Sequence, residues 1–502
     1  MYGAYIIYEF LEKNNFDDYS TDILTDQLND EYLILLTSLI NKNNIKLSYV
    51  ILIILIDISF SEKGELLFGP EEKVICNIAS FLGNNRNDMN LLNLGILLIK
   101  NITYKNSLVK SVFKNYNIIQ FFNEIYDKFV FDKNFMENLI ICMGHFIISR
   151  FGDNNTLCSI KIIKTQLNQN IPIDLLIKYV YILYNLTFFQ NQKVYEEMIK
   201  NEIQKDLMNI YPFTDNNINI NNKKEEKSDD NKIDFFIEDK NSQNSDYKDL
   251  RLLILKILVK IMSSENNEIT QKILDSGFAK FINNVFKSTD IKIIKNAFFC
   301  LSNICAGTYG QISNLFDNDT VFEAFKIAQY VYETLDSNNK LVNSSERQVF
   351  INTFKIINKC ISLIIINSLY EKIIPYIRNH NYSIIKIVLK GLQICLEDNI
   401  DNRNKDLIIL ILNSISKLYV YENDKDEDII MNNSIIFSEF LEKNGFKEIL
   451  DKLLINSDDN IAEAAENIYD ELNYNDNNIN EDINIDDIVE DNDDDNDNDD
   501  NE

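Results

Sequence analysis

The sequence predicts an all-α protein built from tandem helical repeats. Its 502 residues include only 12 Gly and 4 Pro, so the tight turns that an all-β fold needs are scarce. Apolar residues recur at helical spacing in blocks of roughly 10–16 residues, separated by short breaks rich in Asn, Asp and Lys. Similar blocks return at a nearly constant interval along the chain. These three observations favour long helices that stack on one another.

The interval between similar blocks identifies the kind of repeat. A polar residue occupies one register of the blocks: Asn101 and His145 are 44 residues apart, and Asn185 follows 40 residues later. Ile261 comes 76 residues after Asn185, or 42 without a 34-residue polar segment, and Asn303 comes after another 42. A period of about 42 is typical of three-helix armadillo or HEAT units. We therefore expect an all-α, armadillo-repeat, right-handed superhelical solenoid of roughly eight to nine repeats. A non-repetitive helical protein remains the alternative.

Two segments lack the apolar residues that a packed repeat needs. They are rich in Asn and charged residues, so they cannot bury enough apolar surface to offset their ordering entropy. The sequence therefore predicts five parts: an N-terminal helical cap at 1–33, armadillo repeats at 34–213, a disordered insert at 214–247, further armadillo repeats at 248–473, and an acidic disordered tail at 474–502.

The charge balance restricts the partners. The net charge is −29, and residues 481–502 contribute 13 acidic and no basic residues, so the remainder still carries −29 + 13 = −16. Such a charge disfavours binding to the phosphate backbone of nucleic acids. It favours a cationic partner.

The cysteines and apolar runs indicate where the protein works. Seven Cys form no CxxC pair and stand in or beside apolar stretches, as free cysteines of a reducing compartment do. The N-terminus lacks the features of a signal peptide. The longest apolar run, residues 49–56, is far too short to span a bilayer. We expect a soluble intracellular protein without membrane insertion.

Enzyme signatures are missing from the sequence. There is no phosphate-binding Gly-rich loop and no nucleophile elbow. His145 and His380 are the only histidines, and neither belongs to a metal-ligand motif. We expect no catalytic residue, no metal site and no cofactor.

A recurring pair of residues carries the functional prediction. Three blocks place an aromatic residue four positions before an Asn: Tyr181/Asn185, Phe299/Asn303 and Phe354/Asn358. Two others keep only the second polar residue, Asn101 or His145. Residues four apart share one face of a helix. An Asn side chain can bind the N–H and C=O groups of an extended peptide, and aromatic faces can hold the stems of Lys and Arg. The plainer interpretation is solvated asparagines and core aromatics.

One stretch resembles a known family. The segment IKNAFFCLSNICAGTYGQISNLFDNDTVFEAF is similar to a repeat of importin α, with Phe299 at the family's Trp position, Asn303 at its Asn and Gly307 at its helix-ending Gly. The resemblance implies an adaptor that moves between cytoplasm and nucleus and binds basic nuclear localisation signals in a concave groove. It places Asn101, His145, Tyr181 and Asn185 at the major site. It places Phe299, Asn303, Phe354 and Asn358 at the minor site.

The chain also departs from that family. It has no Trp, and its first 45 residues contain only two cations, Lys13 and Lys42, so the family's basic importin-β-binding segment is not seen. The resemblance therefore leaves open whether importin β or an export receptor binds, and it favours the minor site. The alternative function is an armadillo scaffold or cochaperone-type interaction module outside nuclear transport.

Overall fold

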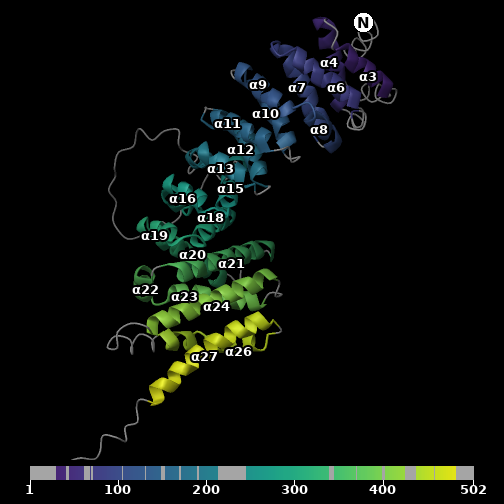
Figure 1. The fold of residues 1–502 in the computed structure, drawn as a ribbon. Helices are drawn as coiled ribbons and strands as arrows, with labels where there is room; N and C mark the ends of the chain where they lie inside the picture. The colour runs from purple at the N-terminus through teal and green to yellow at the C-terminus, as the bar shows by residue number, and fades with distance from the viewer. Residues whose placement is uncertain are drawn as a thin grey trace, which may run out of the picture. The chain divides into compact units, whose positions relative to one another are not determined.

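The computed structural model describes most of the chain (Figure 1). The described residues are 30–40, 44–60, 68, 72–104, 106–129, 132–147, 153–168, 171–188, 191–212, 245–337, 344–368, 370–397, 402–423, 437–456 and 458–481. All regular elements in these ranges are helices.

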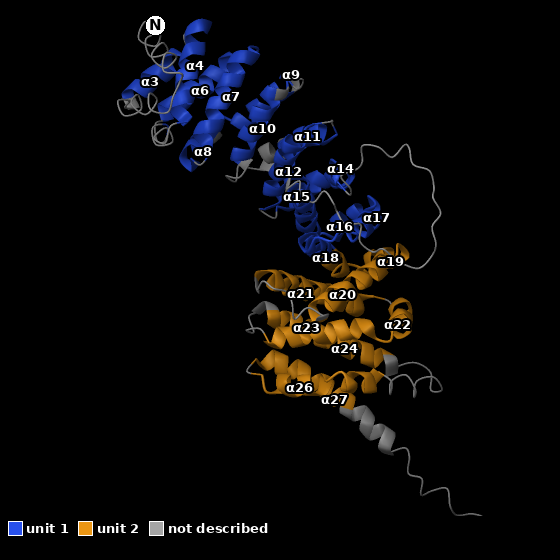
Figure 2. Cartoon of the chain, turned by 180° about the vertical axis from the view of Figure 1, so that it is seen from behind, with its two compact units in different colours: residues 1–300 blue, residues 301–502 orange. Residues whose placement is uncertain are grey.

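The chain forms two compact units, residues 1–300 and 301–502, and the division falls inside helix α18 (Ile291–Cys305) (Figure 2). Unit 1 contains α3 (Asp30–Leu39), α4 (Ile45–Phe60), α6 (Glu72–Asn84), α7 (Met89–Thr103), α8 (Ser107–Lys114), α9 (Ile118–Phe129), α10 (Lys133–Ile147), α11 (Asp153–Leu167), α12 (Ile173–Phe188), α13 (Gln192–Lys200), α14 (Ile203–Ile210), α15 (Ser245–Met262), α16 (Asn267–Asp275), α17 (Phe278–Val285) and most of α18.

Unit 2 begins with the end of α18. Its further helices are α19 (Tyr309–Asp317), α20 (Thr320–Ser337), α21 (Ser344–Asn367), α22 (Tyr370–Asn379), α23 (Ser383–Glu397), α24 (Asn402–Asn423), α26 (Phe446–Leu454) and α27 (Asp459–Glu481).

The helices of unit 1 stack as repeats. The last helix of each repeat, its third helix, packs on the third helix of the next, which gives the series α4, α7, α10, α12 and α15. The second helices form a parallel series: α3 packs on α6, α9 on α11, and α11 on α14. Within a repeat the second and third helices pack on each other, as α6 does on α7 and α11 on α12. A single repeat cannot bury its apolar face, so stacking creates the core.

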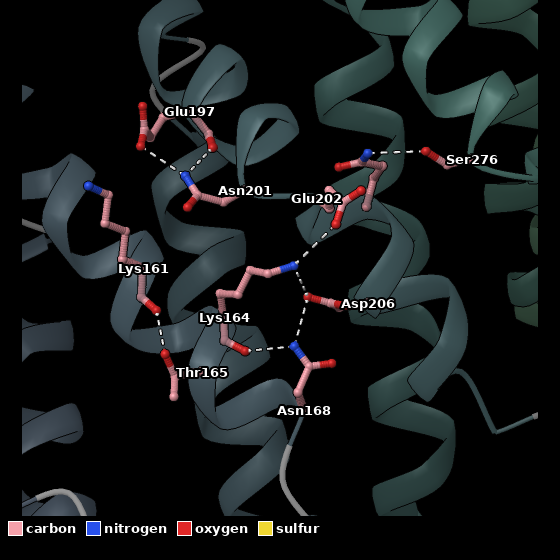
Figure 3. A network of polar contacts seen from close by, with 10 residues as sticks. Lys161, Lys164, Thr165, Asn168, Glu197, Asn201, Glu202, Asp206 and Ser276 are labelled. Atoms are coloured by element: carbon pink, nitrogen blue, oxygen red, sulfur yellow. Dashed lines mark hydrogen bonds and ion pairs between the residues drawn. The ribbon is translucent and has the colours of Figure 1, made fainter.

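Hydrogen bonds between neighbouring repeats show the period directly in unit 1. Asn77 Nδ2 donates to Thr37 Oγ1 at 3.1 Å over 40 residues, and Gln166 Nε2 donates to Tyr126 Oη at 3.2 Å, also over 40. On the second-helix side, Lys164 Nζ lies 3.0 Å from Asp206 Oδ2 over 42 residues (Figure 3). Equivalent positions of adjacent repeats therefore lie about 42 residues apart, as the sequence predicts.

Unit 2 has longer repeats. Its third helices α21, α24 and α27 also pack in series. Here Lys355 Nζ donates to Asn404 Oδ1 over 49 residues, Ser414 Oγ donates to Ser362 Oγ over 52, and Ser416 Oγ donates to Glu471 Oε2 over 55. The third helices themselves are longer: α21 has 24 residues and α24 has 22, whereas α7 and α10 have 15.

Asparagine and aspartate begin many of the helices. Asn106, Asn191 and Asn266 are N-cap residues whose side-chain oxygens accept backbone N–H groups of the first turn, and Asp88 does the same at α7. These groups would otherwise lack partners at a helix start. Capping explains why the breaks between apolar blocks are rich in these residues.

The predicted polar segments lie mainly outside the described residues. Residues 1–29 of the predicted cap, 214–244 of the insert and 482–502 of the tail belong to the undescribed part. Helix α15 begins at Ser245, within the last residues of the predicted insert, and α27 continues to Glu481, within the first residues of the predicted tail.

Candidate peptide-binding face of the third helices

The third helices of unit 1 leave one stripe at least partly exposed. In each, two positions four residues apart lie on the side away from the core, where all the side chains are half-buried or exposed. The pairs are Ile53/Asp57 on α4, Leu97/Asn101 on α7, Ile141/His145 on α10, Tyr181/Asn185 on α12 and Lys256/Lys260 on α15. Phe299 continues the first position on α18. We call these residues the third-helix face of unit 1.

The second positions carry hydrogen-bonding groups. Asn101 Nδ2 donates to Ser59 Oγ of the preceding third helix at 2.9 Å, which holds the amide across the stack. Asn185 Nδ2 is buried and has no acceptor among the described residues. The χ2 torsion of Asn is soft, so a rotation can turn this donor toward a bound carbonyl.

His145 replaces Asn in the second position of α10. Its Nδ1 lies 3.2 Å from Thr103 Oγ1, and its ring centroid lies 5.4 Å from that of Tyr104. Burial lowers the pKa of His145 to about 4, and the nearby Lys110 acts in the same direction. The imidazole is therefore neutral at pH 7, and like Asn it offers one donor and one acceptor.

The first positions are mainly apolar or aromatic. Tyr181 is 50 % exposed, and its ring centroid lies 6.3 Å from that of Tyr184 on the same helix. Phe299 is half-buried, and Lys295 Nζ lies 6.0 Å from its ring centroid. Asn303, one turn after Phe299 on α18, is also half-buried. Six of the eight predicted residues thus retain exposed surface.

The other two predicted residues are placed in the core, so their assignment to a peptide site is wrong. Phe354 and Asn358 on α21 are 0 % exposed. The ring of Phe354 stacks on Tyr332 with a centroid distance of 6.4 Å, and Asn358 Nδ2 donates to the Phe354 carbonyl at 2.9 Å within its own helix. A fully buried side chain cannot contact a peptide without rearrangement of the repeat.

Gly391 on α23 explains how the Asn358 amide fits into the core. A Cβ atom at Gly391 would lie 2.3 Å from Asn358 Cγ, far inside van der Waals contact. The missing side chain of Gly391 therefore makes the space that Asn358 fills.

The structure adds four residues that the sequence pattern did not identify. They are Ile53 and Asp57 on α4 and Lys256 and Lys260 on α15, which occupy first and second positions of the third-helix face. The residue assigned to the second position of α15 from the period, Ile261, is 0 % exposed, and the polar neighbour Lys260 takes its place. The alternation of exposed and buried positions within α15 could have revealed this shift, because an Ile favours the buried side.

Asp57 has an unusual environment. Its Oδ2 atom is buried and lacks a hydrogen-bond partner among the described residues. Burial raises the pKa of this carboxyl to about 6. Such a group gains stability when a cation or donor reaches it.

The described ranges offer no metal site and one long apolar helix. No group of three or more His, Cys, Asp and Glu side chains in these ranges could hold a metal ion. Five of the six described cysteines are buried, and none belongs to such a group. One described segment, Ser345–Asn367 of α21, is long and apolar enough to cross a membrane, but half of it is buried. Core helices that pack on both sides commonly have this composition.

Comparisons with known proteins bear on the fold. No protein-family model matches the chain, and no curated protein matches it by sequence. A solved structure from work on "A conserved phosphorylation switch controls the interaction between cadherin and beta-catenin in vitro and in vivo" is similar with a TM-score of 0.59 and 11 % identity. The match covers 88 % of this chain and 76 % of the chain in that structure.

Two further structures are similar. An engineered protein matches with a TM-score of 0.53 and 12 % identity, over 89 % of this chain and 99 % of its own. A designed armadillo repeat protein matches over 61 % of this chain and 95 % of its own, with 15 % identity and a TM-score of 0.38, too low to carry an argument. At these identities the likeness concerns the fold alone. Together with the stacked repeats, it confirms the predicted fold class: an all-α armadillo-repeat solenoid.

Proposed function

We propose that this protein is a scaffold that binds an extended peptide on the third-helix face of unit 1. The observation that carries the proposal is the recurrence of Asn101, His145 and Asn185 at one solvent-facing register of three consecutive third helices. Each offers both a donor and an acceptor, which suits the alternating C=O and N–H groups of an extended main chain.

The dimensions of the stack suit such a ligand. Packed helices lie about 8–10 Å apart, and an extended chain advances about 3.3 Å per residue. A peptide crossing the stack therefore passes two to three residues per repeat. The exposed ring of Tyr181, one turn before Asn185 on α12, adds contact area of the kind that binding surfaces favour.

Fluorescence anisotropy can test the proposal with three labelled 16-residue peptides of equal length: one rich in Lys and Arg, one rich in Asp and Glu, and one neutral. We expect at least one of them to bind the full chain, with a Kd that rises at least tenfold in the Tyr181→Ala/Asn185→Ala variant, because both positions of α12 are lost. Circular dichroism should show an unchanged helix content.

A matched control places two substitutions away from the face. Leu108→Ala/Gln120→Ala removes exposed side chains from α8 and α9 of one repeat and should leave the Kd unchanged. The proposal fails if none of the three peptides binds, or if binding is equal in the double variant and the control.

An importin α-type nuclear import adaptor is a second, narrower candidate. The Tyr181/Asn185 and Phe299/Asn303 pairs favour it, and so does the Asp57 carboxylate, which has no partner among the described residues and could hold a cationic side chain. Its partners would be basic nuclear localisation signals and importin β or an export receptor, and the protein would occur in cytoplasm and nucleus. In the anisotropy experiment this candidate requires the Lys/Arg-rich peptide to bind more tightly than the other two.

A further inference from the structure

Two lysines of the third-helix face, and a third lysine one turn before Phe299, have no ionic partner in the described part of the chain. Lys256 and Lys260 on α15 and Lys295 on α18 are exposed or half-exposed, and none forms an ion pair with a carboxylate of the described residues. Cys300 Sγ contacts the Leu255 carbonyl at 3.8 Å, which places α18 against α15 within unit 1. We call Lys256, Lys260 and Lys295 the lysine patch.

Some other lysines of unit 1 are paired. On the second-helix side, Lys164 Nζ lies 3.0 Å from Asp206 Oδ2 and 3.9 Å from Glu202 Oε2 (Figure 3). Lys248, at the start of α15, lies 2.6 Å from Asp290 Oδ2. The chain has 78 acidic residues and only 49 basic ones. Lys256, Lys260 and Lys295 have no such carboxylate partner in the described ranges, and two of the three belong to the third-helix face.

Two lysines of the patch instead lie over aromatic rings. Lys256 Nζ lies 5.9 Å from the ring centroid of Tyr184, and Lys295 Nζ lies 6.0 Å from that of Phe299. These rings would otherwise be available to the cationic side chains of a basic peptide. A basic ligand would have to displace the lysines and would also meet their positive charge. An acidic ligand would gain both the charge and the hydrogen-bond donors of the three ammonium groups.

We propose that the lysine patch binds an acidic extended segment of a partner protein, whose Asp and Glu side chains pair with Lys256, Lys260 and Lys295. The inference rests on the proposed scaffold function, because the same peptide continues along Tyr181 and Asn185 on α12. Asp249, exposed two turns before Lys256 on α15, is the acidic residue nearest along that helix. It limits the acidic stretch to the region of the three lysines.

A peptide suits the patch better than a nucleic acid does. The protein carries a net charge of −29, which repels a long polyanion more strongly than a short acidic peptide. Moreover, the neighbouring amide side chains complement a peptide main chain, which alternates donors and acceptors.

The experiment compares the labelled Asp/Glu-rich peptide with its neutral counterpart on the full chain. We expect the acidic peptide to bind at least tenfold more tightly at about 50 mM salt, and the preference to shrink at about 500 mM salt because the charges become screened. Lys256→Glu/Lys260→Glu/Lys295→Glu should abolish the preference. Lys256→Gln/Lys260→Gln/Lys295→Gln, which keeps similar side-chain volume, should reduce it.

The control reverses the charge of three lysines on or next to the first and second helices of a repeat in the same unit. Lys272→Glu/Lys280→Glu/Lys287→Glu changes the net charge equally at exposed positions of α16, of α17 and of the turn after it and should retain the preference. Thermal unfolding establishes that both triple variants are folded.

Four results would overturn the inference. The first is equal binding of the acidic and neutral peptides, and the second is an equal loss of the acidic preference in both Lys→Glu triple variants. The third is tighter binding of a single-stranded DNA of matched charge. The fourth is binding of the acidic peptide only after the acidic residues of 482–502 are changed to amides. The last result would assign the patch to the chain's own tail. If the neutral peptide still binds and still depends on Tyr181 and Asn185, the scaffold function survives while the acidic partner does not.

Discussion

One residue pattern, an aromatic residue four positions before an Asn, has opposite environments in the two units. In unit 1, where inter-repeat hydrogen bonds that do not span the insert join residues 38 to 45 apart, the Tyr181/Asn185 pair lies on the partly exposed stripe. In unit 2, where such bonds join residues 49 to 62 apart, the Phe354/Asn358 pair lies in the core. An aromatic–Asn pair is therefore informative only when its register relative to the core is known. Three predictions test this contrast, beginning with the largest expected effect.

Truncation of Phe354 and of Tyr181, in separate variants, should show the difference between the units most clearly. Phe354→Ala leaves a cavity in the core of unit 2 and should lower the free energy of unfolding by about 3–5 kcal/mol. Tyr181→Ala removes a ring that is 50 % exposed and should change it by no more than about 1 kcal/mol. Urea unfolding followed by circular dichroism measures both. Similar losses in the two variants would contradict the contrast.

The contact between Asn358 and Gly391 provides a second test. Gly391→Ala forces a methyl group onto the Asn358 amide and should destabilise the protein by about 1–3 kcal/mol. In an Asn358→Ala background the same substitution should cost less, because the space is vacant. A double-mutant cycle in urea measures the coupling. Strictly additive effects would show that Asn358 does not occupy this space.

The smallest effect concerns Asp57 on the third-helix face of unit 1. Burial raises its pKa from 3.8 to about 6. Between these values the folded state binds more protons than the unfolded state, so Asp57 lowers stability as the pH rises through this window. Asp57→Asn removes that penalty. It should stabilise the protein by about 1 kcal/mol at pH 7, after allowance for partial exposure, and should lose this advantage near pH 4.

The same urea titrations, at pH 7 and pH 4, check the Asp57 prediction. Asp249→Asn, at an exposed position of α15, serves as the control and should change stability by no more than about 0.5 kcal/mol at pH 7. A gain in the Asp57 variant that is equal at both pH values would exclude titration of this carboxyl as the cause.

The sequence was sufficient for the fold because repeat period and amphipathic spacing are local properties. The period of about 42 predicted the stacking of α7, α10 and α12, and with it the exposed stripe that bears Asn101, His145 and Asn185. The same period failed beyond α18, because α21 is 24 residues long and the interval no longer indicates which side of the helix is buried. On α21 the partly exposed stripe instead includes Lys359, Leu363 and Asn367.

The lysine patch could not be predicted from composition. The acidic net charge of the chain suggested a basic ligand, but net charge is an average over the whole surface. Whether a lysine is paired depends on which carboxylates the fold brings within about 4 Å. Lys164 and Lys256 look alike in the sequence, yet among the described residues only the first has such a neighbour.

The interruption between α14 and α15 has a practical consequence. α14 ends at Ile210 and α15 begins at Ser245, yet these helices pack on each other, and α15 packs on α12 as any consecutive third helix does. The entropy of closing a loop grows only with the logarithm of its length, so lengthening the connection further costs little once the flanking helices have docked. The connection between residues 213 and 244 is therefore a natural place to insert a fluorescent or affinity domain. Such a chimera would report on unit 1 without changing any residue of its third-helix face.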